Sequence, residues 1–487
     1  MGQEGDFMSA RNLQAIVLAA GKSTRFRTEK TKLIEKICGQ EMVLYVTKNL
    51  ENIGIHTTVV VGHQRETIKK VLKKHHEENI EFVIQEEQKG TGHALLCAQS
   101  SFKKDDILIL NADIPLVTKE IIEELYKQHI QTKATLSFVT SYISDPASGA
   151  YGKVIKNDNH IQIVEAKDFT ENMDETSLIN AGIYIVKKSF LEKYISQLKS
   201  NNGSQEFYVT DLIKIACEND YTVTTISAPF DHIRGINTFK ELWIAEQIKR
   251  SEIIRYWMDH GVRFSLAQSV HIDKDVEIEA GTFIDCSVHL LHGTKIGKNC
   301  TIQGFSTLSK AQVGNNTTVY PHSIIDDSII GNNTKIGPFA CVHEKSTVGD
   351  NSIIGNFVEV RKSKIGNQST AKHLTYLANS KIGSQVTIGA GTITCNHDGQ
   401  QYKKTTVEDN VFIASNNSLV APVIIAKNTS TEPGSVITNE VTDQTCSICA
   451  VEQTVTKSPR KIKKSENEPP KIASVTKAKH KQKQTTL

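Results

Sequence analysis

A repeat of six residues in the C-terminal half of the chain restricts its fold more than any other feature. Single aliphatic residues recur at this spacing, most regularly at Ile330, Ile336, Val342, Val348, Ile354 and Val360. Neither an α-helix nor a two-sided strand has a period of six, whereas a triangular coil of short strands buries one aliphatic residue per strand. Each coil covers the side chains of its neighbours. The repeat therefore predicts a parallel β-helix over residues 263–450.

One interval in this region does not fit the repeat. Ile365 and Ile382 are seventeen residues apart, which is not a multiple of six. We therefore expect a loop to leave the coil within residues 366–381, a segment that contains His373.

The N-terminal half has a different pattern, in which short apolar runs alternate with helical periodicity. The runs are Ala15–Ala20, Thr58–Val61, Glu81–Ile84 and Ile107–Leu110. This alternation predicts an α/β domain over residues 12–238, with a Rossmann-like, mostly parallel sheet covered by helices. Ligands of such sheets bind beyond the carboxyl ends of the strands. Residues 239–262 have the pattern of an amphipathic helix and are expected to form a linker arm.

The two ends of the chain are expected to lie outside these domains. Residues 1–11 are expected to be flexible, and residues 451–487 to be a disordered basic tail. The tail lacks the aromatic residues that stack on bases, so we do not expect it to bind nucleic acid. The sequence has no run of about 18 apolar residues and no secretion leader, which favours a cytoplasmic protein without a membrane segment.

The first loop of interest is Leu18–Phe26, which follows a predicted buried strand. Its small residues, Ala19–Gly21, would let the backbone approach phosphate oxygens. Arg25 and the nearby Lys32 could neutralise charge on an α-phosphate during its transfer. Taken alone, this loop could also be an ordinary turn between a strand and a helix.

The second loop, Gln85–Ala94, follows the apolar run that ends at Ile84. Gln85 and the turn at Gly90-Thr91 could contact the edge of a nucleotide base. This loop would then lie beside the phosphate loop at the same edge of the sheet.

The third loop, Asn111–Pro115, places a single carboxylate, Asp113, directly after a buried run. Mg²⁺ is commonly held by one or two carboxylates together with substrate phosphates, so Asp113 is a candidate magnesium ligand. The alternative is an aspartate that only caps a helix or a turn.

These loops, taken with further motifs in the same order, resemble bacterial N-acetylglucosamine-1-phosphate uridyltransferases. The additional N-terminal motifs are Tyr151-Gly152, Glu165, Asn180-Ala181-Gly182, Gln205–Asp211 and Asn237. Those of the C-terminal half are Ile336–Ala340, Gly355–Glu359, His373–Leu377 and Gly389–Asn396. The match covers nearly the whole chain, and the sequence is similar to the two-domain glucosamine-1-phosphate acetyltransferase and uridyltransferase family. The resemblance implies a left-handed β-helix.

For the first domain, the resemblance implies that GlcNAc-1-phosphate attacks UTP and releases pyrophosphate with the help of Mg²⁺. The implied UTP site consists of Leu18, Ala19, Ala20, Gly21, Lys32, Gln85, Gly90 and Thr91. Arg25 and Lys32 would be catalytic, and the sugar would be held by Gly152, Glu165, Asn180 and Asn237. Asp113 and Asn237 would share the metal. Two positions depart from the family, Ser23 in place of a glycine and Thr31 in place of a proline, and neither removes a charge.

For the second domain, the resemblance implies transfer of an acetyl group from acetyl-CoA to glucosamine 1-phosphate. His373 would be the general base for the sugar amine, as suits an imidazole near neutral pH. The implied contacts are Arg361 and Tyr376 to the sugar, and Asn396 and Ser415 to acetyl-CoA. Related coils place such sites between neighbouring chains, so a homotrimer is expected.

Several positions that bind phosphate or CoA in the family differ here, which leaves acetyl transfer open. They are His343, Arg361, Thr387, Tyr402 and Ala450. Each lost charge-assisted contact should cost about 1–3 kcal/mol, or about tenfold in binding. Three alternatives remain: a uridyltransferase whose β-helix only forms trimers, a non-catalytic scaffold or regulatory subunit, and a pyrophosphorylase for dTTP, CTP or glucose 1-phosphate.

Overall fold

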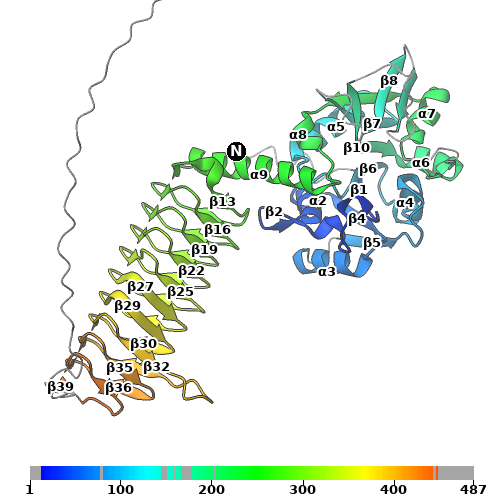
Figure 1. Ribbon diagram of the computed structural model, residues 1–487. Helices are drawn as coiled ribbons and strands as arrows, with labels where there is room; N and C mark the ends of the chain where they lie inside the picture. The colour runs from blue at the N-terminus through cyan, green and yellow to red at the C-terminus, as the bar shows by residue number, and fades with distance from the viewer. Residues whose placement is uncertain are drawn as a thin grey trace, which may run out of the picture.

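The computed structural model describes residues 12–76, 80–143, 151–157, 160–165, 177–200, 205–442 and 446–447. These residues form an α/β domain and a long β-helix, with one long helix, α9 (Phe239–Asp259), between them (Figure 1). The expected flexible N-terminus and basic tail lie outside the described residues. So does Ala450. Within the described part of the chain, no helix has both the length and the apolar character that a bilayer span requires.

The N-terminal domain is built on a nine-stranded sheet with the order β11-β7-β10-β6-β1-β4-β5 and a hairpin, β8–β9, beside β10. Its strands are β1 (Leu13–Ala19), β4 (His56–Val61), β5 (Ile80–Ile84), β6 (Asp106–Asn111), β7 (Leu136–Tyr142), β8 (Lys153–Asn157), β9 (His160–Val164), β10 (Leu178–Lys187) and β11 (Val223–Ser227). Strand β10 runs antiparallel to β6 and β7, while β1 is parallel to both β4 and β6. The sheet is therefore mostly parallel, as expected.

Helices cover both faces of this sheet, which explains its continuous apolar runs. The helices are α2 (Met42–Asn52), α3 (Arg65–His75), α4 (Thr91–Cys97), α5 (Lys119–Gln131), α6 (Lys188–Tyr194), α7 (Asp211–Glu218) and α8 (Phe230–Ile233). Short 3₁₀ helices are η1 (Thr24–Phe26), η2 (Lys32–Ile34), η3 (Gln99–Ser101) and η4 (Ile195–Gln197). Neighbouring residues of β1 bury their side chains in different clusters: Val17 packs with residues of α2 and α5, and Ile16 with residues of α4, α6 and α7.

The β-helix consists of short parallel strands in two sheets. The longer sheet contains β12 (Arg263–Phe264), β13 (His271–Ile272), β15 (Phe283–Ile284), β16 (His289–Leu291), β18 (Thr301–Ile302), β19 (Thr307–Ser309), β21 (Thr318–Val319), β22 (Ile324–Asp326), β24 (Lys335–Ile336), β25 (Cys341–His343), β27 (Ile353–Arg361), β29 (Thr370–Ala378), β31 (Thr387–Ile388), β32 (Ile393–Cys395), β34 (Phe412–Ile413), β35 (Ser418–Val420), β37 (Ser430–Thr431), β38 (Val436–Ile437) and β39 (Cys446–Ser447). The other contains β14 (Glu277–Ile278), β17 (Lys295–Ile296), β20 (Gln312–Val313), β23 (Ile329–Ile330), β26 (Thr347–Val348), β28 (Lys364–Ile365), β30 (Ser380–Ile382), β33 (Thr405–Val407) and β36 (Val423–Ile425).

The six-residue aliphatic repeat lines the interior of this coil, which confirms the fold class: a mostly parallel α/β domain followed by a left-handed parallel β-helix. Ile336, Val342, Ile354 and Val360 have no exposed surface. Equivalent strands of successive coils are in register, so each aliphatic side chain is covered by its counterparts in the coils above and below.

The prediction of a loop within residues 366–381 is wrong. Strand β29 occupies most of that segment and pairs in register with β27, with His373 opposite Asn356. The coil from Ile365 to Ile382 is seventeen residues long because one of its corners is tighter. This corner contains one left-handed residue, Asn379, whereas the equivalent corner of an earlier coil contains two, Glu344 and Lys345. The chain leaves the coil later: Lys381 pairs with Thr406, twenty-five residues on, and residues 396–404 form the excursion.

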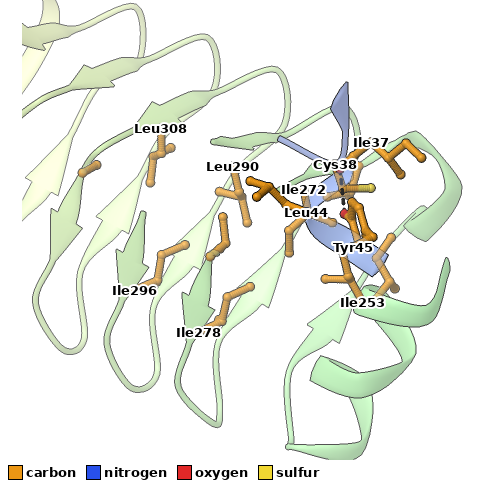
Figure 2. Close-up of a cluster of buried hydrophobic side chains, with 14 of the residues drawn as sticks. Ile37, Cys38, Leu44, Tyr45, Ile253, Ile272, Ile278, Leu290, Ile296 and Leu308 are labelled. Carbon is orange, nitrogen blue, oxygen red and sulfur yellow. Dashed lines mark hydrogen bonds between the residues drawn. The ribbon is translucent and has the colours of Figure 1, made fainter. Parts of the chain in front are cut away.

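The N-terminal domain covers the first coils of the β-helix. The hairpin β2 (Lys36–Ile37) and β3 (Gln40–Glu41) packs there with α2 and α9, and Figure 2 shows Ile37, Tyr45 and Ile253 continuing the row of aliphatic side chains inside the coil. The backbone N–H of Lys274, which lies in the first coils, donates to Cys38 O at 2.9 Å. The short η5 (Ala267–Ser269) lies between β12 and β13.

Candidate functional site

Three residues from distant parts of the sequence meet at the carboxyl end of the sheet. The Lys32 ammonium donates to Asp113 Oδ2 at 2.6 Å and to Asn237 Oδ1 at 2.8 Å. The Lys32 side chain is only 12% exposed, and that of Asp113 21%. The weak dielectric screening of such a half-enclosed position strengthens each of these interactions.

The elements that carry these residues explain their positions. Asp113 follows β6, which pairs directly with β1 in the sheet. Asn237 is held beside it because the N–H of Ile236 donates to Asp113 O at 2.9 Å. Asn237 also precedes α9, whose cap fixes it: Thr238 Oγ1 accepts from Glu241 N–H, and Glu241 Oε2 accepts from Asn237 N–H. This is a variant of the capping box.

The loop after β1 explains the two departures from the family pattern. Ser23 adopts a left-handed conformation, with φ 56°, which favours glycine, and its hydroxyl accepts from Lys32 N–H at 3.2 Å. Thr31 caps η2 by accepting from Leu33 N–H, and its own N–H donates to Gln64 Oε1 at 2.8 Å. A proline at Thr31 could not make this last bond. Both residues thus help to fix the backbone of Lys32.

The other proposed phosphate-loop residues lie at the end of β1. Ala19 and Ala20 are buried, Leu18 is half-buried, and Gly21 is exposed. Arg25 is exposed on η1, where its guanidinium has no ion pair to another described residue. Its charge is therefore available to an anionic ligand.

The loop with Gln85, Gly90 and Thr91 is held by the segment around Phe207. Gly92 N–H donates to Phe207 O at 2.8 Å, and Phe207 N–H donates to Lys89 O at 2.9 Å. Gly90 needs to be glycine, because its φ is +101° and a Cβ there would lie 2.5 Å from Phe207 O. Thr91 Oγ1 accepts from Val209 N–H at 3.2 Å.

The phosphate loop (Leu18–Phe26) and the base loop (Gln85–Ala94) do not follow adjacent strands. Strand β4 lies between β1 and β5, so the three candidate loops, which follow β6, β1 and β5, are not carried by three neighbouring strands. The turn after β4 fills the gap: a Cβ at Gly62 would lie 2.9 Å from Ala20 Cβ and 2.8 Å from Gln88 Nε2. The absence of a side chain at Gly62 lets the two loops approach.

The candidate sugar-binding residues also gather at this end of the sheet. Asn180 N–H donates to Gly152 O at 2.9 Å, and a Cβ at Gly152 would lie 3.3 Å from Glu165 Oε2. Glu165 Oε1 accepts from the Thr210 hydroxyl at 2.7 Å. The segment around Phe207 that holds the base loop therefore also holds the candidate sugar-binding residues.

Sequence reasoning missed two residues that connect these groups. Thr210 lies in the quoted Gln205–Asp211 motif but had no assigned role. The Tyr151 hydroxyl accepts from Gly235 N–H at 3.0 Å and so connects the candidate sugar-binding residues to the segment that contains Asn237. Burial raises the pKa of Tyr151 to about 12, which keeps the hydroxyl protonated. Its place beside Gly152 in a quoted motif was the available signal.

Asp113 and Asn237 supply two oxygens of the kind that a magnesium ion uses, and the Lys32 ammonium lies between them in this structure. Two oxygens, one from a carboxylate and one from an amide, converge on a single positive centre. Mg²⁺ uses such donors together with substrate phosphates and water. Among the described residues, no three His, Cys, Asp or Glu side chains form a metal cluster, so the remaining ligands of an ion here would come from phosphate and solvent.

The candidate acetyl-transfer residues occupy the outer surface of the β-helix. His373 is exposed on β29, and Ser415 lies two coils further along the same corner, where Gly391 N–H donates to Leu374 O and Asn416 N–H to Ala390 O. Arg361 ends β27, Tyr376 lies on β29, and the buried Asn396 begins the excursion.

The substituted positions of this region form a network of their own. Arg361 Nε donates to Glu344 Oε1 at 2.8 Å, and His343 Nε2 lies 3.0 Å from Glu359 Oε1. The hydrogen bond to Glu344, and to a smaller extent the one to Tyr376, raises the pKa of Arg361. Thr387 and Tyr402 are exposed, and the Tyr402 ring lies 4.5 Å from that of His397 in the excursion, tilted by 46°. Much of the positive charge of Arg361 is therefore already paired.

The chain is similar to known proteins along most of its length. Residues 14–274 match the nucleotidyl transferase family model, and residues 266–375 match the model of the GMPPB C-terminal domain. The bifunctional protein GlmU of Thermosipho melanesiensis is 39% identical over 442 residues, which cover 91% of this chain and 96% of the relative. The GlmU of Thermosipho africanus is 37% identical over 446 residues, with coverage of 91% and 96%. That of Clostridium botulinum strain 657 is 35% identical over 444 residues, with coverage of 90% and 96%.

Proposed function

Because the chain is a nucleotidyltransferase and belongs to the family of the bifunctional GlmU proteins, we propose that it joins UTP to GlcNAc-1-phosphate and releases pyrophosphate. The observation that carries the proposal is the convergence of Asp113 and Asn237 on the Lys32 ammonium. This cation-binding arrangement lies at the end of β1, beside the loop that offers backbone N–H groups to phosphate.

In this reaction an oxygen of the sugar phosphate attacks the α-phosphorus of UTP. The bond from that phosphorus to the bridging oxygen of the β-phosphate breaks, and pyrophosphate leaves. No protein nucleophile is needed, so the chain contributes position and charge. Lys32 and Arg25 face the developing negative charge, and the Ser23 and Thr31 contacts keep Lys32 in place.

The metal and the sugar have different sets of residues, with Asn237 assigned to both. Mg²⁺, when bound at Asp113 and Asn237, would offset the charge of the triphosphate and orient its phosphates. Gly152, Glu165 and Asn180 would hold the N-acetylated sugar, with Glu165 oriented by Thr210. The Tyr151–Gly235 hydrogen bond would keep these two sets at a fixed separation.

A panel of substrates tests the proposal. The purified protein is incubated with each of UTP, dTTP and CTP, with GlcNAc-1-phosphate or glucose 1-phosphate, and with or without Mg²⁺, and pyrophosphate is measured. We expect release with UTP, GlcNAc-1-phosphate and Mg²⁺, and a loss of at least about a hundredfold in kcat/KM in Asp113→Ala, in line with the loss of an electrostatic group of the site. Full activity of Asp113→Ala, or a preference for another substrate pair, would overturn the assignment.

The same membership supports a second activity in the β-helix. We propose that His373 accepts a proton from the amine of glucosamine 1-phosphate as the amine attacks acetyl-CoA, with Ser415 and Asn396 near the CoA and Arg361 and Tyr376 near the sugar. The exposure of His373 on the outer surface of β29 favours a site completed by a neighbouring chain in a homotrimer. A monomeric mass by light scattering, or unchanged CoA release in His373→Ala, would contradict this.

A further inference from the structure

The Gln85 side chain is held by two hydrogen-bond acceptors. Its Nε2 lies 3.2 Å from Gly90 O and 2.9 Å from His93 Nδ1. The side chain is almost completely buried, at 2% exposure. A buried amide of this kind is fixed in orientation by its partners rather than by solvent.

The backbone partner favours one of the two orientations of the amide. Gly90 O can only accept a hydrogen bond, so the amide nitrogen of Gln85 has to face it, since the opposite orientation would bring two oxygens together. Gly90 is itself immobilised by the segment at Phe207, because its backbone meets Phe207 too closely for any side chain. The Gly90 carbonyl is thus one of two contacts that set the orientation of the Gln85 amide.

His93 supplies the second acceptor. With the amide N–H 2.9 Å from it, His93 Nδ1 is the acceptor, so in this arrangement the ring carries its proton on Nε2. His93 lies in the first turn of α4, directly after the Gly90 turn, and its ring lies 6.1 Å from that of Phe207. Gly90 and His93 together use both N–H groups of the Gln85 amide.

Only the carbonyl oxygen of Gln85 is left to a ligand. No described residue donates a hydrogen bond to Oε1. Unlike the buried polar atoms of this structure that lack both a partner and exposed surface, Oε1 is not shut off from its surroundings. Gln85 thus presents a pure acceptor at the base loop. Uracil carries a ring N–H at N3 that can donate to it, whereas the N3 of cytosine is itself an acceptor and would face an oxygen lone pair.

We propose that His93 is a specificity-determining residue, which makes the site select a pyrimidine with a ring N–H by fixing the orientation of the Gln85 amide. The inference rests on the proposed function and on the expectation from the sequence that Gln85 contacts the base of UTP. His93 acts through Gln85 and is a positioning residue. Without it, the amide would lose one of its two acceptors and could rotate to offer its NH₂ group to cytosine.

The test compares kcat/KM for UTP with kcat/KM for CTP within each variant. We expect His93→Leu, which lacks an acceptor, to lower the UTP to CTP ratio about tenfold or more, as expected for one hydrogen bond that discriminates between bases. His93→Asn should keep most of the ratio, because its Oδ1 can replace Nδ1 as the acceptor. The ratio is unaffected by the fraction of protein that is folded, so a weakly folding variant remains informative.

The outcomes separate this inference from the proposed function. A wild-type protein that shows no preference for UTP would contradict the proposed function itself. If the wild type prefers UTP and His93→Leu keeps the same ratio, the uridyltransferase stands and the role of His93 is wrong. Equal loss of the ratio in His93→Leu and His93→Asn would also overturn the role, because an acceptor at that position would then not matter.

Discussion

Gly39 of the nucleotidyltransferase domain meets Asp273 of the β-helix so closely that a Cβ at Gly39 would lie 2.5 Å from the Asp273 carboxyl carbon. Gly39 forms the turn of the β2–β3 hairpin, with φ +78°. The hairpin follows η2 directly, so this junction begins only a few residues after Lys32. Burial, with Lys249 and Lys48 nearby, lowers the pKa of the adjacent Lys274 to about 8, which shows how closely the two domains enclose this corner.

Gly39→Ala should disturb the junction far more than a matched change elsewhere. Gly54 has a similar φ of +72°, but a methyl group added there would have no neighbour within 4 Å, so Gly54→Ala should cost only the left-handed strain of about 1–2 kcal/mol. Gly39→Ala adds an overpacking cost of about 1–3 kcal/mol. Thermal unfolding of both variants measures the difference, and kcat for pyrophosphate release shows whether the strain reaches Lys32. Equal unfolding temperatures would show that the junction yields freely.

Lys32→Met should remove activity without unfolding the domain. Its ammonium is the common partner of Asp113 and Asn237, and losing one such preorganised charge commonly lowers kcat about 10²–10³-fold. Lys30→Met is the matched control, because Lys30 lies two residues earlier in the same loop and is exposed. Initial rates at saturating UTP, with thermal unfolding as a check of folding, make the comparison. Similar rates for the two variants would remove Lys32 from the reaction.

The sequence predicted those parts of the fold that follow from local patterns. The aliphatic period of six predicted the β-helix, and the buried runs predicted β1 and β6, the strands that precede Lys32 and Asp113. The length of a corner, by contrast, depends on whether one residue or two adopt a left-handed conformation, and a residue such as Asn379 is compatible with both. The loop was therefore expected around His373, although it lies at residues 396–404.

Contacts between distant segments left even less trace in the sequence. Nothing near Gly39 indicates that Asp273 will face it, because the contact depends on how α9 orients two domains. His93 was passed over for a similar reason: its role depends on the side chain of Gln85, eight residues earlier, and on a carbonyl of the turn between them. Strand order across β4 was likewise not readable from alternation alone.

Asp106 should make the stability of the N-terminal domain depend on pH in acid. Burial alone would raise the pKa of Asp106, but the His129 imidazole and the Lys187 ammonium, which lie 3.3 and 2.6 Å from its Oδ1, outweigh burial and lower that pKa. A carboxyl whose pKa is lower in the folded state stabilises the fold at pH values above its unfolded pKa of about 3.9. This contribution is lost as the pH falls through the folded value.

The variant Asp106→Asn should abolish that part of the acid dependence. The side chain of His129 has no exposed surface and Lys187 lies 2.6 Å from Asp106 Oδ1, so the loss at neutral pH should be about 1–3 kcal/mol. The difference between variant and wild type should shrink as the pH drops below about 4. Urea unfolding at several pH values measures it, with Asp259→Asn at the exposed end of α9 as control. A constant difference across the pH range would mean that Asp106 does not carry the linkage.

Glu344 should limit the second proposed activity. Its carboxylate pairs with Arg361 at 2.8 Å, and a guanidinium already paired in this way has less attraction left for a sugar phosphate. Glu344→Gln keeps the shape of the side chain but removes its charge. We therefore expect the KM for glucosamine 1-phosphate in the acetyl-CoA reaction to fall about threefold to tenfold, which corresponds to about 1 kcal/mol in binding, with little change in kcat because His373 is untouched. Glu408→Gln, on a later coil, serves as the control. If KM is unchanged while CoA release is measurable, Arg361 does not contact the phosphate, and the sugar site has to be sought elsewhere along β29.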